Sequence, residues 1–134
     1  MAIACTWRGD ATDRELNVLH AEAFGTRVHG DDEWDWHAQL HGHSLGWVTA
    51  RDGDALVGFV NVVWDGLVHA WIQDTMVAER ARHRGIATAL VAHAVEGSRA
   101  AGCEWLHVDF EDHLRAFYIE TCGFTATSAG LIEL

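Results

Sequence analysis

The stretch that decides the fold runs from Met76 to Leu90 and reads MVAERARHRGIATAL. An apolar, strand-like segment leads into it, three arginines follow in alternating positions, and residues 86–99 have strong helix character. A strand that ends in a basic, glycine-containing turn and continues as a helix leaves several backbone N–H groups unpaired at the helix start. Those N–H groups, the positive end of the helix dipole and the guanidinium groups suit a phosphorylated ligand.

Length and composition predict one folded domain over residues 1–134, because 49% of the residues are hydrophobic and no low-complexity run is present. The apolar runs are too short to span a bilayer, and no basic segment followed by an apolar stretch opens the chain. We therefore expect neither secretion nor membrane association. The three cysteines cannot all pair and lack the spacing of metal ligands, which favours reduced thiols in a cytoplasm; they are Cys5, Cys103 and Cys122.

The net charge of −11 argues against nucleic acid as a partner, since a phosphate backbone would be repelled. This charge is compatible with a cationic substrate such as an amine, although acidity also serves solubility. Three of the nine basic residues nevertheless lie between Arg80 and Arg84. An acidic protein with such a local arginine cluster is expected to use it.

The remaining pattern predicts a sheet with flanking helices. Strands are expected over residues 3–7, 45–51, 55–64, 67–77 and 104–110, and Asp52-Gly53-Asp54 forms a hairpin turn between the second and third. Helices are expected after a cap at Asp10 or Thr12, around residues 34–40, from residue 86 to 101, and over 114–122. The strand–helix–strand unit around residues 86–101 must close as a right-handed crossover, so its two strands run parallel. Residues 124–134 are expected to form a final hairpin around Gly130.

Two motifs resemble those of one enzyme family. Arg82-His83-Arg84-Gly85-Ile86-Ala87 reads R-x-x-G-x-A and resembles the acetyl-CoA pyrophosphate loop of the GNAT superfamily of N-acetyltransferases. Phe117-Tyr118-x-x-x-x-Gly123-Phe124 resembles the F-Y-x-x-x-G-F element near the C-terminus of these enzymes, with one more residue between Tyr and Gly. The resemblance covers nearly the whole chain. It implies an α/β (α+β) GNAT acyl-CoA N-acyltransferase fold, with a mixed, mostly antiparallel central sheet flanked by helices.

The chain departs from the family pattern at several positions. Glu79 and His83 stand where the family often has Pro and Gly, and Ala87 replaces the final Gly. The extra residue near the C-terminus leaves two registers open. Anchoring on Gly123-Phe124 places the family's tyrosine position at Ile119, whereas anchoring on Phe117-Tyr118 requires the helix to absorb an insertion.

The resemblance implies acetyl-CoA as the acyl donor, no metal, and direct attack of a neutral amine on the thioester. Tyr118, the only tyrosine of the chain, is then the candidate acid for the departing thiolate. The predicted cofactor contacts are Met76, Val77, Arg82, His83, Arg84, Gly85, Ile86, Ala87, Thr88 and Phe117.

The group that removes the amine proton is less well defined. Trp71 and Gln73 stand where the family often places a Glu or His, and neither is a base. Asp74 is the nearest carboxylate and our candidate catalytic base. A structural carboxylate at the end of a strand is the alternative for Asp74, with a water relay in place of a dedicated base, and His69 and Asp109 are further candidates.

An aromatic wall beside acidic groups is predicted to hold a cation or a flat ring of the acceptor. Its candidate residues are Trp34, Trp36, Trp71 and Asp109, with packing in the core as the alternative for each tryptophan. Three nearby histidines at 37, 41 and 43 lack a cysteine or carboxylate at a recognisable ligand interval, so we expect no metal site there.

The sequence thus predicts a cytoplasmic N-acetyltransferase that acts on a small-molecule amine. One alternative is an acetyltransferase for protein lysines or N-terminal amines, and another is a non-catalytic CoA-binding sensor or interaction domain. Edge strands at the C-terminal end allow a homodimer. No nucleic acid or membrane partner is expected.

Overall fold

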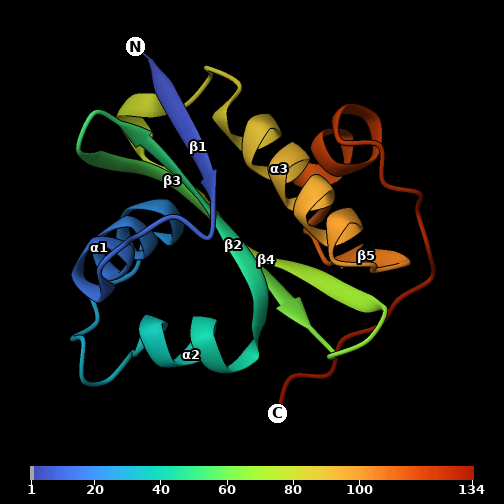
Figure 1. Ribbon diagram of the computed structural model, residues 1–134. Coiled ribbons are helices and arrows are strands. Elements are labelled where there is room, and N and C mark those ends of the chain that lie inside the picture. Colours follow the sequence, from blue (N-terminus) through green and yellow to red (C-terminus); the bar gives the residue numbers. More distant parts are fainter. Residues whose placement is uncertain (1) are drawn as a thin grey trace.

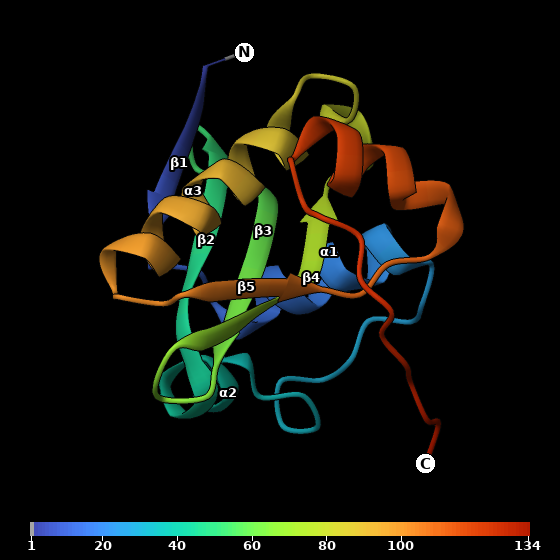
Figure 2. The same ribbon diagram turned by 90° about the vertical axis from the view of Figure 1, so that its right-hand side faces the viewer.

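Five strands form one mixed sheet in the order β1-β2-β3-β4-β5 in the computed structural model, which describes residues 2–134 (Figure 1). The first four pair antiparallel and are β1 (Ile3–Trp7), β2 (Ser44–Asp52), β3 (Ala55–Trp64) and β4 (His69–Val77). The fifth, β5 (Trp105–Val108), pairs parallel to β4, which confirms the predicted crossover. Figure 2 shows β5 turning away from β4 after this short paired segment.

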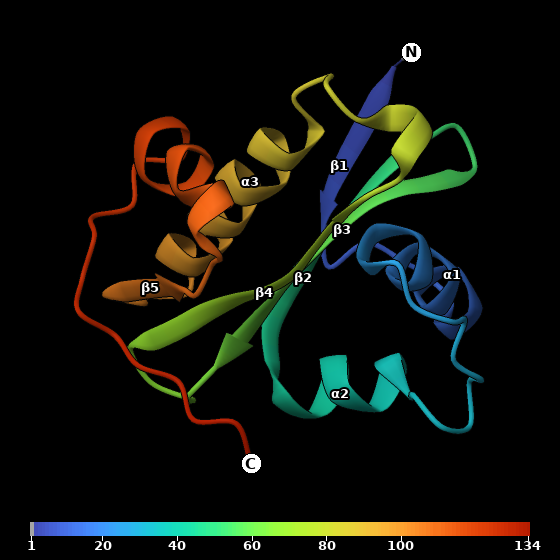
Figure 3. The ribbon, with the colours of Figure 1, turned by 180° about the vertical axis from the view of Figure 1, so that it is seen from behind.

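Helices cover both faces of the sheet (Figures 1 and 3). Helices α1 (Asp13–Phe24) and α2 (Trp36–His43) lie on one face. Helix α3 (Ile86–Ala100) lies on the other, beside a π-helix, η3 (Ala116–Thr121). None of the helices within residues 2–134 has the length and apolar character needed to cross a membrane. The predicted α/β fold with a mixed, mostly antiparallel sheet is confirmed.

The core forms where the two helix layers meet the sheet. Leu16 of α1, Trp36 of α2 and Phe59 of β3 are almost fully buried on one face, with the ring centroids of Trp36 and Phe59 5.7 Å apart. On the other face, α3 buries Ile86 and Leu90. This layered packing fixes the end of β4 between α1 and the start of α3, where the candidate site lies.

The predicted C-terminal hairpin is wrong. Residues 124–134 contain no strand, and Leu131 and Ile132 are more than four-fifths exposed. Small and polar side chains fill most of this segment, so two short arms would bury too little apolar surface to hold a hairpin together. The segment instead runs down the side of the molecule beyond β5 (Figure 2).

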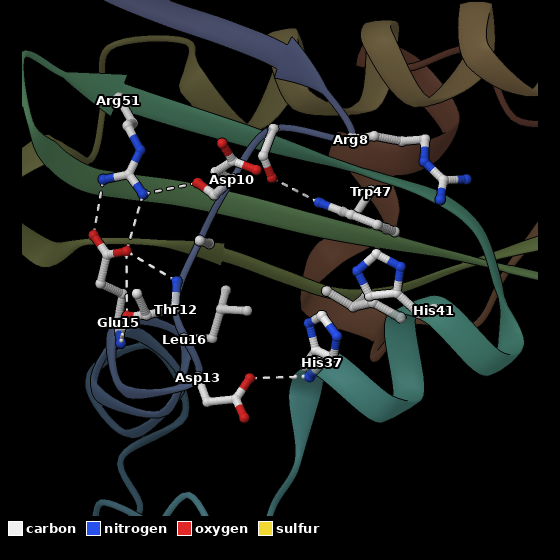
Figure 4. Close-up of a pocket in the computed structure, with 13 residues that line it drawn as sticks. Arg8, Asp10, Thr12, Asp13, Glu15, Leu16, His37, His41, Trp47 and Arg51 are labelled. Carbon is white, nitrogen blue, oxygen red and sulfur yellow. Dashed lines mark hydrogen bonds and ion pairs between the residues drawn. The ribbon is translucent and has the colours of Figure 1, made fainter.

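The start of α1 is tied to the sheet by one charged pair. Thr12 caps the helix and forms a capping box with Glu15. Arg51 of β2 donates two hydrogen bonds to the Glu15 carboxylate, of 2.8 and 3.0 Å, and a third to the carbonyl oxygen of Asp10 (Figure 4). This arrangement ties the start of α1, which packs on β3 and β4, to β2.

We expect Glu15→Gln to lower the free energy of unfolding near neutral pH by about 1 kcal/mol, because the pair is partly exposed and screened by water. The hydrogen bonds from Arg51 lower the pKa of Glu15 from 4.5 to about 2. A lowered pKa in the folded state means that the stabilisation is fully present above about pH 4.5 and is lost as the pH falls toward about 2. Urea unfolding of both proteins across this range measures it. A difference in stability that stays constant with pH would contradict the assignment.

Candidate active site

The second half of β4 has an open edge. Among residues 2–134, β5 pairs with β4 only from His69 to Ile72, so no strand accompanies residues 73–77 on that side. The N–H of Ala78 donates to the carbonyl oxygen of Val57 on β3 over 2.8 Å. Backbone groups alternate along an antiparallel strand, so those of Met76 also point toward β3 and those of Val77 point to the open side. Arg82 Nε donates to the Val77 carbonyl oxygen there, at 3.4 Å.

A β-bulge interrupts β4 near the start of this open edge. Gln73 pairs with Asn61 and Met76 with Phe59, so two β4 residues, Asp74 and Thr75, stand opposite one residue of β3. Asp74 has a φ of +54°, a left-handed conformation that non-glycine residues seldom adopt. Bulges re-aim side chains and are frequent beside active sites. The bulge thus places two polar residues, Asp74 and Thr75, next to the point where the pairing of β4 with β5 ends.

The loop after β4 presents the start of α3 without a capping side chain. Gly85 is the N-cap residue with a φ of +76°, and no side chain hydrogen-bonds to the N–H groups of the first turn. A Cβ at Gly85 would meet nothing within 4 Å, so the left-handed backbone, rather than crowding, requires glycine here. The free N–H groups and the helix dipole make this turn suitable for a phosphate, as the sequence predicted.

The open edge, the loop and η3 enclose one cavity of about 470 Å³. Most of the predicted cofactor contacts line it: Val77, Arg82, His83, Gly85, Ile86, Ala87, Thr88 and Phe117, together with Tyr118. Two predicted contacts do not. Met76 is fully buried and its backbone pairs with β3, whereas its neighbour Thr75 lines the cavity. Arg84 is exposed on the loop outside the lining.

The arginines of the loop contact different parts of the molecule. Arg82 lines the cavity, whereas Arg80 points to the β2–β3 turn and lies 3.7 Å from the Asp52 carboxylate. The arginines that look equivalent in the sequence therefore have different roles. Arg82 lines the cavity, whereas Arg80 joins the loop to the sheet.

The π-helix η3 absorbs the extra residue near the C-terminus. The N–H of Cys122 donates to the carbonyl oxygen of Phe117, five residues earlier, over 2.9 Å. A π turn accommodates one more residue than an α turn, and such insertions are frequent at functional sites. Of the two registers left open by the sequence, the structure therefore shows the one anchored on Phe117-Tyr118, with the insertion taken up inside the helix.

Tyr118 is held against β4 at the wall of the cavity. Its hydroxyl donates to Thr75 Oγ1 over 3.2 Å, and its ring stacks on that of Phe110 with centroids 5.3 Å apart. The side chain is 6% exposed, and this burial raises the pKa of the Tyr118 hydroxyl above its usual value of 10. The hydroxyl therefore stays protonated at neutral pH and can donate a proton.

Comparison with known proteins decides the family. The model of the acetyltransferase (GNAT) family matches residues 13–124, most of the chain. The chain belongs to the GNAT acetyltransferase family. No curated protein sequence matches it. The GNAT domain matches the solved structure of AAC(6')-Iy with a bisubstrate analogue at a TM-score of 0.78 and 17% identity, over 100% of this chain and 98% of that one.

Two further solved structures share the GNAT fold. Glucosamine-6-phosphate N-acetyltransferase from Arabidopsis thaliana matches with a TM-score of 0.75 and 14% identity over 98% of both chains. Ribosomal-protein-alanine N-acetyltransferase from Brucella melitensis biovar Abortus 2308 matches with a TM-score of 0.74 and 20% identity over 99% of both chains. At these identities the likeness shows a common fold, and the acceptors named for these proteins differ.

Asp74 of this GNAT protein does not line the cavity beside Tyr118. Burial raises the pKa of its carboxyl above the usual 3.8, and a charge on His20 of α1 opposes this rise. His20 was missed in the sequence. Its position four residues after Leu16, on the core-facing side of a helix, was the available signal.

The four predicted acceptor residues do not gather in one pocket. Trp71 and Asp109 line a cavity of about 610 Å³ between the end of β5 and the C-terminal segment. Trp34 lies in the loop before α2 and is 40% exposed. Trp36 is fully buried beneath that loop, so a ligand cannot touch it, and its role is packing.

We expect Arg82→Ala and Gly85→Asp each to weaken acetyl-CoA binding at least tenfold, or about 1.4 kcal/mol. The first removes a guanidinium group from the cavity, and the second adds a negative charge and a strained left-handed residue at the helix start. Isothermal titration calorimetry measures both affinities.

Arg99→Ala and Gly102→Asp are matched controls at the far end of α3. Gly102 has a φ of +87° and equally open surroundings, so its replacement carries the same backbone strain without reaching the cavity. These controls should bind acetyl-CoA as the wild type does. Wild-type affinity in both loop variants would refute the loop assignment.

Proposed function

We propose that this GNAT acetyltransferase transfers the acetyl group of acetyl-CoA to the amine of a small molecule. One observation supports it most. The open edge of β4, the uncapped start of α3 and the protonated Tyr118 hydroxyl meet at one cavity. A phosphate site, an extended slot and an acid are the three features that a coenzyme A thioester requires of its enzyme.

Each part of the cavity has a role toward the donor. The N–H groups of residues 86–88 and the Arg82 guanidinium hold the diphosphate. We expect the backbone of Val77, which faces the open side, and that of Thr75, which lines the cavity, to pair with the amides of the pantetheine arm, as they would with another strand. Placing the thioester beside the amine in this way supplies up to about 7–11 kcal/mol of the rate acceleration.

Asp74 and Tyr118 perform the proton transfers. An alkylamine has a pKa near that of lysine, about 10.4, so it arrives as an ammonium ion and must lose a proton first. The Asp74 carboxylate takes that proton. The nitrogen lone pair then forms the C–N bond while the C–S bond breaks with its electrons on sulfur. Tyr118 gives a proton to that sulfur and regains one from the acylated nitrogen.

A small-molecule acceptor is supported by three observations. Two structural relatives are named for aminoglycoside and glucosamine-6-phosphate acetylation, which are small-molecule reactions. The cavity lined by Trp71 and Asp109, about 610 Å³, has the size of a small-ligand pocket. The net charge of −11 attracts a cationic amine. We retain Trp71, Asp109 and the exposed Trp34 as proposed acceptor contacts.

Thiol release from acetyl-CoA with a panel of small amines, basic peptides and no acceptor tests this function. We expect release to depend on a small amine. Release only with peptides would favour protein acetylation. Tight acetyl-CoA binding without release for any acceptor would contradict catalysis and leave a CoA-binding sensor.

We expect Tyr118→Phe to lower turnover at least tenfold with little change in acetyl-CoA affinity, because the ring packing stays and only the proton donor is lost. Steady-state kinetics and calorimetry on the same preparation measure the two quantities. Thr75→Val is the control for the hydrogen bond, since it removes the partner but keeps the acid. Unchanged turnover in Tyr118→Phe would remove this hydroxyl from the mechanism.

A further inference from the structure

The paired parts of β4 and β5 carry aromatic side chains outside the core. Ala70 of β4 is fully buried, and side chains alternate along a strand, so its neighbours His69 and Trp71 point to the opposite face of the sheet. The parallel register sets His69 beside Trp105 of β5 and Trp71 beside His107. None of these four rings belongs to the buried core cluster. Their packing therefore leaves ring surface for another partner.

Three of these side chains, His69, Trp71 and His107, form a flat ring platform. His69 Nδ1 and His107 Nε2 are hydrogen-bonded over 2.8 Å, and their ring planes differ by 28°. An imidazole N–H and an imidazole lone pair both lie in the ring plane, so the two rings meet edge to edge. The Trp71 ring is nearly parallel to that of His107, at 17°, with centroids 4.9 Å apart.

The ring platform is held in place by the sheet. Its three residues lie on paired strands rather than on loops. The hydrogen bond from His69 fixes the rotation of the His107 ring, which is itself exposed to solvent. A surface whose rings are already oriented loses little entropy when a flat ligand stacks on it.

The cavity of about 610 Å³ beside β5 includes part of the ring platform. Trp71 and His107 line it, and its charged lining residues are Asp109, Asp112 and Arg115. With His107 neutral, two carboxylates and one guanidinium group leave a net charge of −1. This charge suits a ligand with a single ammonium group and gives a polycation little to bind.

The same cavity lies next to the donor site. Phe110 lines it, and the Phe110 ring stacks on that of Tyr118 with centroids 5.3 Å apart. Tyr118 in turn lines the cavity proposed for acetyl-CoA. Asp109 lies between His107 and Phe110 in the chain. A ligand that extends from the ring platform past Asp109 therefore points its far end toward the Tyr118 side.

We propose that the acceptor is an aromatic amine whose ring stacks on the ring platform and whose ammonium group lies beside Asp109. A strand rises about 3.3 Å per residue, so Asp109 lies about 6.6 Å beyond His107. A short alkyl chain between ring and nitrogen covers this distance, whereas a nitrogen bonded directly to the ring does not. The inference rests on the proposed function and names its substrate class.

The amines 2-phenylethylamine and 2-cyclohexylethylamine test the class, because they share charge, chain and approximate size and only the first has an aromatic ring. We expect the wild-type kcat/KM to be about fivefold higher for the aromatic amine. Trp71→Leu removes the largest ring of the platform and should bring this ratio near one. Trp105→Leu is the matched control. Trp105 is 62% exposed and does not line the cavity, so its variant should keep both wild-type values.

A wild-type ratio near one would overturn the inference while amine acetylation itself stands. A fivefold ratio that Trp71→Leu leaves unchanged would also overturn it, because the preference would then arise elsewhere.

NMR on the wild-type protein tests the ring site without turnover and without a variant. The full chain, labelled on its indole and imidazole nitrogens and saturated with CoA, is titrated with 2-phenylethylamine. The ring current of the amine should shift the signals of Trp71 and His107 and leave that of Trp105 in place. Unshifted platform signals would refute the site. Shifted signals without thiol release from acetyl-CoA would instead refute the proposed function, leaving the platform as a binding site for an aromatic amine.

Discussion

The structure depends on β4 having a strand neighbour on both sides for only half its length. From His69 to Ile72 it is a central strand, held by β3 and β5. Beyond the bulge at Asp74 and Thr75 it keeps β3 alone, and its other edge faces a cavity. Unpaired strand edges are costly in most proteins because they attract other strands. Here α1, α3 and η3 flank the edge. The cavity between them leaves the edge accessible to an extended ligand.

The bulge connects this constraint to the chemistry. The two residues of the bulge differ in their surroundings. Thr75 accepts a hydrogen bond from the Tyr118 hydroxyl on the side of α3, whereas Asp74 lies outside the cavity lining and burial raises the pKa of its carboxyl. The proposed proton acceptor and the proposed proton donor therefore belong to, or contact, the same short backbone segment.

The sequence predicted the strands, the main helices, the parallel crossover and most of the cavity lining, because periodicity and the arginine–glycine motif are local signals. It did not predict the bulge at Asp74, since nothing local marks where a strand gains a residue relative to its partner. The direction of the Met76 backbone groups and the burial of the Trp36 side chain depend on contacts with segments distant in the sequence. Only the folded structure shows these contacts. The insertion after Tyr118 was visible, but its accommodation as a π-helix required coordinates.

The most direct measurement is a crystal structure of the complex with acetyl-CoA. The account predicts that the pantetheine amides pair with the backbone of Thr75 and Val77, and that the diphosphate accepts hydrogen bonds from the N–H groups of residues 86–88. The thioester sulfur would then lie within reach of the Tyr118 hydroxyl. A donor bound elsewhere, for instance in the polar cavity of about 320 Å³ between α2 and the β1–α1 loop, would contradict it.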